Sequence, residues 1–256
     1  MTYDPILLTK IVKREVVRGN KRKYFRFRKD RWYGGVATGD VVGCNLRCKF
    51  CWAWRFTWNT KTKGKFLSPN EAFLAMKKKA SNKIRQLRVS GGEPTIGFEH
   101  LLQLVEISIS ENYHFIIETN GLVLGLDYFP AKQLGRFHNQ GIEIRVSIKG
   151  ASPKEFELLT GSSPKYWYEQ LRALDHLVKS GLEVGTEAYP AVMLSFSTKK
   201  SIMYLKDKLE EIDPELPKHI DPEYVILYPH VEYILRAMNL KPRIAYRPDN
   251  IPRELI

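Results

Sequence analysis

Three closely spaced cysteines are the residues of this sequence that most clearly indicate a chemistry. Cys44, Cys48 and Cys51 follow the order C-x3-C-x2-C, and the 256-residue chain contains no other cysteine. Thiolates at this density are soft ligands, which favour a soft metal ion or an iron-sulfur cluster. A zinc site and a ferredoxin-type cluster each need a fourth ligand, yet the nearest downstream histidine is His100. Three thiolates on four irons leave one iron open.

The open iron has a natural use. The amino and carboxylate groups of S-adenosylmethionine can chelate it, which places the sulfonium beside the cluster. We therefore expect Cys44, Cys48 and Cys51 to bind one 4Fe-4S cluster, with S-adenosylmethionine as the second cofactor. Two simpler interpretations are a structural zinc loop and cysteines buried as small hydrophobic residues. A disulfide framework is excluded because an odd number of cysteines leaves one thiol unpaired.

A second motif, residues 90–94 (SGGEP), follows the second predicted strand. Its paired glycines allow the backbone to approach a ligand closely, and the carboxylate of Glu93 would stand at the C-terminal mouth of a parallel sheet. A ligand ammonium group would fit such a site. The alternative is an ordinary βα turn, in which glycine pairs are common. Because the cysteines follow strand one and this motif follows strand two, a shared site is the better interpretation.

Strand-like and helical segments alternate from about residue 36 to residue 230, the pattern of β/α units around a parallel sheet. The predicted strands are Gly35–Val42, Ile84–Ser90, His114–Asn120, Ile142–Lys149, Leu182–Val192 and Tyr224–Tyr228. A capping box from Ser68 to Glu71 starts one helix, and the other predicted helices are Phe98–Glu111, Phe129–Phe137, Tyr166–Ser180 and Lys199–Ile212. These units predict an α/β fold, a partial TIM-like (β/α)6 barrel with an N-terminal β-hairpin.

The bulk composition fits one catalytic domain, since 256 residues with 43% hydrophobic content can bury one large core. We expect residues 1–34 to form a basic hairpin extension, residues 35–230 the barrel, and residues 231–256 a tail laid on it. No stretch reaches the roughly 18 to 20 apolar residues of a membrane span, and the N-terminus lacks the order of a signal peptide. We therefore expect a cytoplasmic protein with no membrane contact.

Most of the net charge of +13 lies in residues 10–31, which contain eleven Lys or Arg and only two acidic residues, Glu15 and Asp30. Apolar residues alternate with these charges on both sides of Gly19-Asn20, which predicts a two-stranded hairpin. Such a basic element attracts polyanions or acidic proteins. It could dock RNA, but we favour a solvated surface or a dock for an acidic electron donor of the ferredoxin or flavodoxin type.

Taken together, the cysteine motif and the GGEP motif resemble those of the radical S-adenosylmethionine superfamily, in the same order and places, and the likeness covers most of the chain. The resemblance implies that the three cysteines bind the cluster. It implies that Phe50, just before the last cysteine, lies near the adenine. It also implies that Gly91, Gly92, Glu93 and Pro94 receive the methionyl amino group.

Four later motifs are similar in order and spacing to the glycyl-radical-enzyme activating enzymes of the pyruvate formate-lyase type: residues 117–121 (IETNG), 147–149 (SIK), 155–161 (EFELLTG) and 227–230 (LYPH). By this resemblance Glu118 and Thr119 lie near the ribose and the methionine carboxylate, and Lys149 matches a lysine on the next strand. We include Asn120 and Ser147 among the expected cofactor-binding residues. The activating enzymes have a carboxylate where Ser147 stands, as part of a monovalent-cation site.

An arginine offers a substitute for that cation. With period-two alternation, Arg145, Ser147 and Lys149 share one face of their strand, so the guanidinium could neutralise the ligand carboxylate without a bound ion. The hypothesis requires Arg145 to point into the barrel. The alternative is a solvent-facing arginine at a strand start.

The implied reaction begins with one-electron reduction by a ferredoxin- or flavodoxin-like donor and produces a 5'-deoxyadenosyl radical that removes hydrogen from a substrate. The protein must then exclude water and present one C–H bond. Candidate groups for lining the substrate site are Trp52, Trp54, Arg55, Glu187 and Tyr189, although core packing explains the tryptophans equally well.

The substrate stays open at this level. It could be a glycine of a partner protein, as the activating-enzyme resemblance implies, a nucleotide of RNA such as tRNA, or a small metabolite or peptide. A non-enzymatic alternative is a metal- or iron-sulfur-containing nucleic-acid-binding module, which would leave the GGEP motif and the barrel unexplained.

Overall fold

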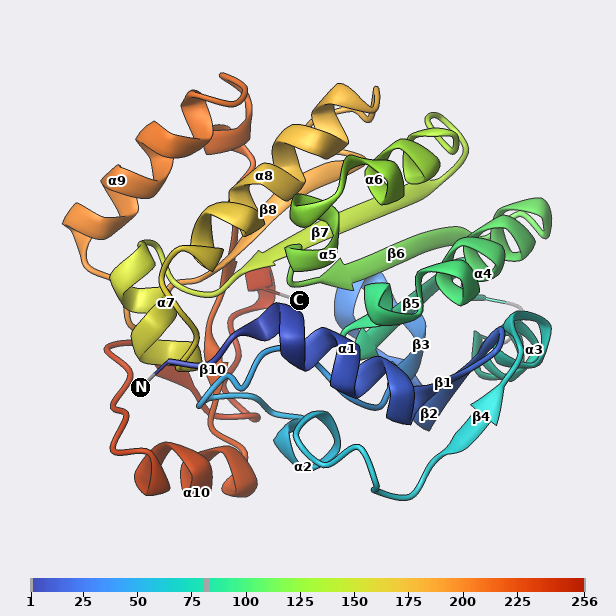
Figure 1. Ribbon diagram of the computed structural model, residues 1–256, viewed down its shortest axis with the longest axis horizontal. Helices are drawn as coiled ribbons and strands as arrows, with labels where there is room; N and C mark the ends of the chain where they lie inside the picture. The colour runs from blue at the N-terminus through green and yellow to red at the C-terminus, as the bar shows by residue number, and fades with distance from the viewer. Residues whose placement is uncertain (1, 81–82, 256) are drawn as a thin grey trace.

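The structure, a computed structural model, describes residues 2–80 and 83–255. Within these residues the main sheet has nine strands in the order β1-β2-β3-β5-β6-β7-β8-β9, with β4 paired to β2 (Figure 1). The strands are β1 (Val17–Arg18), β2 (Lys21–Asp30), β3 (Val36–Val41), β4 (Lys65–Leu67), β5 (Gln86–Gly91), β6 (His114–Thr119), β7 (Ile142–Ile148), β8 (Ala188–Met193) and β9 (Asp221–Glu223).

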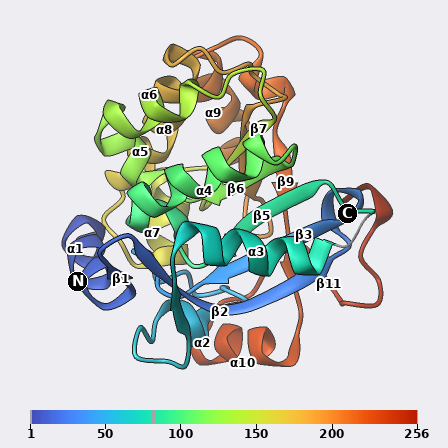
Figure 2. The ribbon, with the colours of Figure 1, turned by 90° about the vertical axis from the view of Figure 1, so that its right-hand side faces the viewer.

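Strands β3, β5, β6, β7, β8 and β9 pair in parallel one after another, while β2 is antiparallel to β3. In Figures 1 and 2 the strands curve around an interior, with helices α3, α4, α6 and α8 on the outer side. The helices are α1 (Pro5–Val16), α2 (Trp54–Thr57), α3 (Pro69–Ala80), α4 (Phe98–Ser110), α5 (Leu122–Leu126), α6 (Tyr128–Gly135), α7 (Pro153–Thr160), α8 (Tyr166–Lys179), α9 (Lys199–Glu210) and α10 (Pro229–Ala237). The predicted α/β fold, a partial barrel that begins with an antiparallel hairpin, is confirmed.

Strand β7 shows how the sequence separates the core from the barrel interior. Ile142, Ile144, Val146 and Ile148 are buried in the hydrophobic core, as period-two alternation requires. The residues between them carry polar side chains, and two of these, Arg145 and Ser147, line an internal cavity. The barrel is therefore apolar toward its helices and polar inside.

The predicted sixth strand, Tyr224–Tyr228, is wrong. The last parallel strand is β9, only Asp221–Glu223, and Val225–Ile226 (β10) pairs with Ala245–Tyr246 (β11) in a separate two-stranded sheet. The sequence of β9 does not predict a strand, because acidic residues are depleted in strands. Here they are tolerated because the Arg145 guanidinium of β7 contacts both Asp221 and Glu223 inside the barrel.

The predicted fifth strand, Leu182–Val192, is too long at its start, since regular pairing begins at Ala188. The Glu187 carboxylate accepts hydrogen bonds from His138 and from the backbone N–H of Asn139 and Glu183. Glu187 thus stabilises the turn before β8 at the opposite end from the cysteines.

The N-terminal hairpin is confirmed as β1 and β2, which pair antiparallel around Gly19-Asn20. Sequence reasoning missed α1, although Asp4 followed by Pro5 is a helix-start signal, and the Asp4 carboxylate caps the helix by accepting from the N–H of Ile6 at 2.7 Å. The basic segment is therefore divided between a helix and a strand that is continuous with the barrel sheet.

The capping box before α3 is confirmed, because Ser68 Oγ and Glu71 each accept a hydrogen bond from the other's backbone N–H. The predicted helices at residues 98–111, 129–137, 166–180 and 199–212 are α4, α6, α8 and α9. No helix of the described residues combines the length and the apolar character that crossing a membrane requires.

Candidate cofactor site

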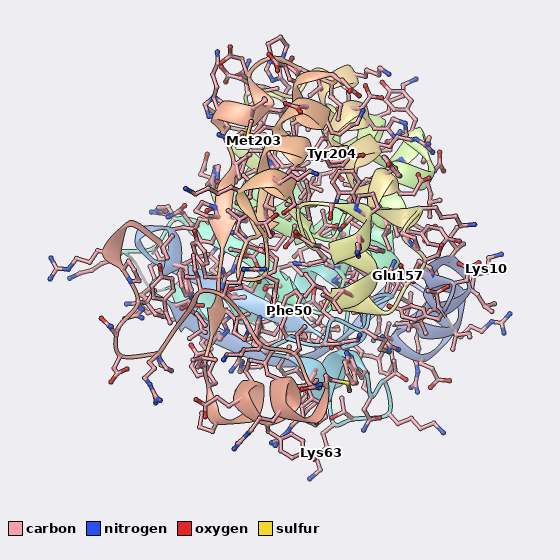
Figure 3. All side chains as sticks on the ribbon, turned by 90° about the vertical axis from the view of Figure 1, so that its left-hand side faces the viewer. Lys10, Phe50, Lys63, Glu157, Met203 and Tyr204 are labelled. Atoms are coloured by element: carbon pink, nitrogen blue, oxygen red, sulfur yellow. The ribbon has the colours of Figure 1, made fainter. Side chains whose placement is uncertain are left out.

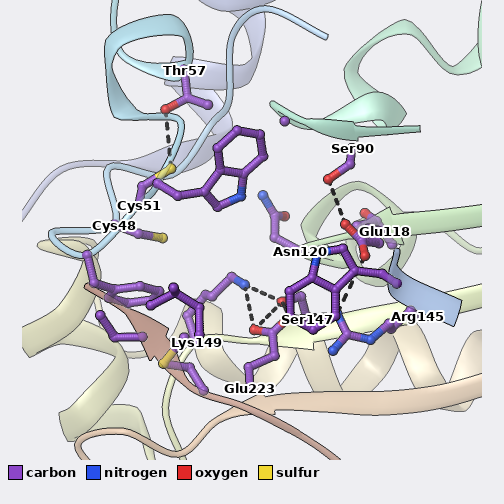
Figure 4. Close-up of a pocket in the computed structure, with 18 of the residues that line it drawn as sticks. Cys48, Cys51, Thr57, Ser90, Glu118, Asn120, Arg145, Ser147, Lys149 and Glu223 are labelled. Carbon is purple, nitrogen blue, oxygen red and sulfur yellow. Dashed lines mark hydrogen bonds and ion pairs between the residues drawn. The ribbon is translucent and has the colours of Figure 1, made fainter. Parts of the chain in front are cut away.

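A cavity of about 710 Å³ lies inside the barrel, where the carboxyl ends of the strands meet (Figure 4). Its volume is typical of small-ligand sites, which are roughly 300 to 1,000 Å³. Most of the expected metal and cofactor residues line it: Phe50, Cys44, Cys48, Cys51, Gly91, Gly92, Glu93, Glu118, Thr119, Asn120, Ser147 and Lys149. Pro94 instead begins the short helix η2 (Pro94–Gly97) and is buried behind them.

The loop with the three cysteines is held from both sides. The N–H groups of Gly43 and Cys44 donate to the carbonyls of Phe56 and Thr57 in α2, at 3.0 and 3.2 Å. On the other side, the backbone N–H of Arg47 donates to the Tyr3 hydroxyl at 2.8 Å. The guanidinium of Arg47 donates to the Cys44 carbonyl at 2.5 Å. These contacts hold the loop in place through its backbone.

The three thiols face a protected interior. Burial raises the pKa of each above its ordinary value, to about 12 for Cys44. Cys51 Sγ lies 3.6 Å from the Thr57 hydroxyl, a contact drawn as a dashed line in Figure 4. Cys44 Sγ accepts from the Asn120 amide at 3.6 Å. Metal binding must displace the thiol protons, and a bound cation compensates for the charge that burial disfavours.

The donor set fits a cluster. In residues 2–80 and 83–255 no three His, Cys, Asp or Glu side chains converge as a single metal ion would require. Thiolates of a cluster bind different irons, so the three cysteines need not converge on one point. With three soft thiols on one cavity wall, the site suits a three-cysteine cluster better than zinc.

The two glycines of the GGEP motif serve the packing of the loops. Gly91 has φ +87°, a conformation that favours glycine, and a Cβ at Gly92 would lie 2.7 Å from the Val41 carbonyl oxygen and closer still to that of Gly43. The N–H groups of Gly92 and Glu93 donate to those same carbonyls at 2.8 and 2.9 Å. The close approach that the glycines allow is therefore to the end of β3 and the cysteine loop, and not only to a ligand.

The Glu93 carboxylate is largely used within the protein. One oxygen accepts from the N–H and hydroxyl of Thr95 and from the Thr119 hydroxyl, and the other accepts from the Asn120 N–H at 2.8 Å. This carboxylate joins the ends of β5 and β6. Only the second oxygen has spare capacity for a ligand ammonium.

A buried arginine of the basic segment supports this loop from behind. Arg22 is 1% exposed, and its guanidinium donates to the carbonyls of Val16, Lys23 and Glu93 at 3.2 to 3.4 Å. Burial lowers its pKa to about 10. The charge is therefore not available to an external polyanion.

Replacing Arg22 with leucine should lower the free energy of unfolding by about 2 to 4 kcal/mol, because three buried carbonyls lose a donor. Lys21→Ala, at the exposed neighbouring position, should change it by less than about 0.5 kcal/mol. Urea unfolding followed by circular dichroism measures both. Equal stability of the two variants would show that Arg22 does not support the loop.

Glu118 lies at the centre of a polar network on the cavity wall. It accepts from Arg88 at 3.0 Å, from Ser90 Oγ at 2.6 Å and from the Tyr33 hydroxyl at 2.7 Å. Burial alone would raise its pKa, but the charges of Arg88 and Arg145 outweigh burial and lower the pKa to about 2. Glu118 is thus an anion at neutral pH.

Arg145 points into the barrel, as the sequence hypothesis requires. Its guanidinium contacts Asp221 at 2.6 Å, Glu223 at 2.8 Å and Glu118 at 3.8 Å. Figure 4 shows Arg145, Glu118 and Glu223 in the same cavity. Burial lowers its affinity for a proton, yet the surrounding anionic groups raise the pKa well above the ordinary value. A ligand carboxylate would therefore compete with three protein carboxylates for this cation.

Glu223 is a site residue that sequence reasoning missed, because it precedes the predicted sixth strand. Its carboxylate accepts from Ser147 Oγ at 2.7 Å and from Lys149 Nζ at 3.2 Å, and Lys149 also contacts Ser147. The carboxylate that Ser147 lacks is thus supplied by the neighbouring end of β9. A second missed residue, the fully buried Gln170 of α8, donates to the carbonyls of Asn120 and Ser147 and accepts from the Lys149 N–H, which fixes the ends of β6 and β7.

Two aromatic side chains at the end of the cysteine loop reach the cavity. Phe50 lines the cavity and packs on Phe196, with ring centroids 5.8 Å apart. Trp52 also lines the cavity, and the Arg26 and Arg28 guanidiniums lie 5.3 and 5.5 Å from its ring centroid.

Of the other proposed lining groups, Tyr189 reaches the cavity and hydrogen-bonds Glu143. Trp54 instead stacks with Tyr233 of α10, and Arg55 lies exposed over the Trp54 ring. Trp54, Arg55 and Glu187 are not among the lining residues of the described chain, so these three proposals were wrong.

A family model described as the radical SAM superfamily matches residues 40–202. The chain belongs to this superfamily. A GTP 3',8-cyclase of Actinobacillus succinogenes is 28% identical over 158 residues, which make up 60% of this chain and 44% of that protein. The chain thus spans about half the length of the curated relatives it matches.

Two solved structures share the fold. HydG, a maturase of the FeFe-hydrogenase, has a TM-score of 0.55 at 14% identity over 86% of this chain and 47% of HydG. SuiB of Streptococcus suis, bound to S-adenosylmethionine, has a TM-score of 0.53 at 15% identity over 83% of this chain and 46% of SuiB. At these identities the likeness shows the radical SAM fold alone.

Membership of the radical SAM superfamily makes this chain an enzyme, and it implies a 4Fe-4S cluster, S-adenosylmethionine and a reductant. The non-enzymatic nucleic-acid-binding alternative is therefore wrong. The narrower likeness to activating enzymes gains no support from these comparisons. Matching curated relatives, such as those of Actinobacillus succinogenes and Pasteurella multocida, are GTP 3',8-cyclases.

Proposed function

We propose that Cys44, Cys48 and Cys51 hold one 4Fe-4S cluster and that S-adenosylmethionine binds beside it in the barrel cavity. When bound, the cluster supplies the electron that splits S-adenosylmethionine, and the 5'-deoxyadenosyl radical then removes hydrogen from a substrate. The observation that supports this proposal most is that the three thiols, the GGEP loop and the polar ends of β6 and β7 line one cavity.

The chain's own residues can orient a zwitterionic cofactor. Five Lys or Arg and five Asp or Glu side chains line the cavity, so both signs are presented. The second carboxylate oxygen of Glu93 can accept a further hydrogen bond and therefore suits the methionyl ammonium. Lys149 follows the end of β7 near Cys48, and its ammonium suits the methionyl carboxylate. Thr119, Asn120 and Ser147 position these groups, and Phe50 provides an apolar surface for the adenine.

For the substrate we favour a small molecule. Ile251 and Leu255, from the last helical turn and the segment before it, line the same cavity, and cofactor and substrate must share its volume of about 710 Å³. A glycine of a partner protein, the activating-enzyme proposal, would require this segment to move aside. RNA is less favoured, because Arg22 is buried and Arg26 and Arg28 pair with Asp40.

Anaerobic reconstitution with iron and sulfide, followed by dithionite and S-adenosylmethionine, should release 5'-deoxyadenosine, measured by liquid chromatography. GTP, the molecule in the name of the matching relatives, is the first substrate to add, and a substrate should increase product formation. A protein with a filled cluster that forms no 5'-deoxyadenosine would refute the proposal. Co-purified nucleic acid, or a glycyl radical in an added protein, would redirect the substrate assignment.

A further inference from the structure

The outer side of the cysteine loop is covered by α1, whose two faces differ. Val12 and Val16 are buried against Val42 and Ile96. Leu7 and Ile11, on the opposite side of the helix, are 59% and 49% exposed. Leu7, Lys10, Ile11 and Arg14 follow helical spacing and share this outer stripe.

Other residues of α1 and of the segment before it connect the helix to the cysteine loop. Thr9 accepts from the Asn45 amide at 2.9 Å, and the Tyr3 hydroxyl accepts from the Arg47 N–H at 2.8 Å. The end of α7 completes the surface, because the Lys49 backbone N–H donates to the Leu159 carbonyl and the Lys49 ammonium donates to the Leu158 carbonyl. Leu158 is 53% exposed.

We call this surface the donor face and define it by one set of residues: Leu7, Lys10, Ile11, Lys13, Arg14, Arg47, Lys49 and Leu158. Figure 3 shows Lys10 on α1 and Glu157 on α7 along one side of the molecule, well apart from Met203 and Tyr204 of α9. Residues 5–16, 44–51 and 153–160 together contain six Lys or Arg and three Glu. The donor face is thus basic, with exposed aliphatic side chains among the charges.

We propose that the donor face docks an acidic one-electron carrier protein that reduces the cluster. The inference rests on the proposed function, since it assumes a cluster at the three cysteines. One electron passes from the reduced carrier, which is oxidised, to the cluster, which is reduced, and no bond forms or breaks. The cavity occupies the other side of the loop, so α1 and α7 offer the carrier a short approach that leaves the substrate site free.

The chemistry of the face favours a protein over RNA. Base recognition relies on exposed aromatic rings, whereas the aromatic residues of the basic segment pack inside: Tyr24 is buried and Phe25 stacks on Phe56. Small interfaces of complementary charge suit transient electron transfer, because steering raises the association rate and few apolar contacts permit rapid release.

The test compares Lys10→Glu/Arg14→Glu with Lys200→Glu/Lys206→Glu, which makes the same change in charge on exposed residues of α9. With a reduced acidic ferredoxin at low salt, the first variant should form 5'-deoxyadenosine about tenfold more slowly than the wild type, and the control should not. With dithionite both should match the wild type. The dissociation constant for oxidised ferredoxin, measured by biolayer interferometry, should rise about tenfold for the first variant alone.

The neutral variant Lys10→Gln/Arg14→Gln should lose less, and the difference should shrink at high salt. Equal behaviour of the two charge-reversed variants with ferredoxin would overturn the docking proposal. So would a wild-type enzyme that dithionite activates but ferredoxin neither binds nor reduces, or tighter binding of tRNA than of ferredoxin to this face. Absence of product with dithionite would instead refute the proposed function.

Discussion

Replacing Cys48 with alanine is expected to abolish both the cluster and the formation of 5'-deoxyadenosine. Cys48 is 7% exposed and lines the cavity together with the other two thiols. No fourth cysteine exists in the chain to replace it. The two remaining thiolates cannot hold a 4Fe-4S cluster that requires three cysteine ligands. The iron content after reconstitution and the yield of 5'-deoxyadenosine should therefore both fall to background.

The matched control is Lys49→Gln, one residue further along the same loop. Its side chain contacts the carbonyl of Leu158 on the outer side, away from the thiols. It should retain full iron content and dithionite-driven product. If Cys48→Ala kept the wild-type iron content and product yield, the assignment of the three cysteines as cluster ligands would be wrong.

Replacing Arg145 with leucine should destabilise the fold by about 3 to 5 kcal/mol, because removal of one partner leaves buried charges uncompensated. Three carboxylates contact this one guanidinium, whose side chain is only 12% exposed. Arg26→Gln removes an ion pair at a side chain that is 44% exposed and should cost about 1 kcal/mol or less. Urea unfolding of both variants measures the difference, and equal losses would show that the network does not depend on Arg145.

The same network predicts a pH dependence. The pKa of Glu118 is lowered in the folded state to about 2, below the ordinary value of about 4.3. Its contribution to stability is therefore complete above the unfolded pKa and is lost as the pH falls toward 2. In Arg145→Leu one of the two cations beside Glu118 is gone, so the folded-state pKa of Glu118 should move back toward its unfolded value. The melting temperature of the variant should then fall less steeply with decreasing pH than that of the wild type. Melting temperatures measured between pH 6 and pH 3 test this, and parallel curves for the two proteins would contradict it.

The parts of the site that were predictable are those encoded by local sequence. The cysteine loop and the GGEP loop each follow a strand with a clear apolar pattern, and parallel strands bring their carboxyl ends to one edge. This is why Cys44 and Glu93 could be placed in one site. The alternation on β7 likewise predicted that Arg145 and Lys149 share a face.

The parts that escaped prediction depend on contacts between distant segments. Glu223 and Asp221 are not typical strand residues, and inside the barrel both contact Arg145 of β7, which compensates their charge. Gln170 is one polar residue on an amphipathic helix, and its role requires the ends of two strands to lie beside it. The charges of the basic segment predict one exposed surface, but the Arg22 side chain points inward. There its guanidinium donates to three backbone carbonyls, two of which belong to α1 and to the loop after β5.

The most direct measurement of the central claim is the electron paramagnetic resonance spectrum of the reconstituted, reduced protein before and after S-adenosylmethionine is added. An iron without a cysteine ligand should bind the cofactor, so the cluster signal should change in shape and g values. The Cys48→Ala protein should give no such signal. A wild-type cluster spectrum that S-adenosylmethionine leaves unchanged, or a purified protein that holds zinc in place of iron and sulfide, would contradict the account.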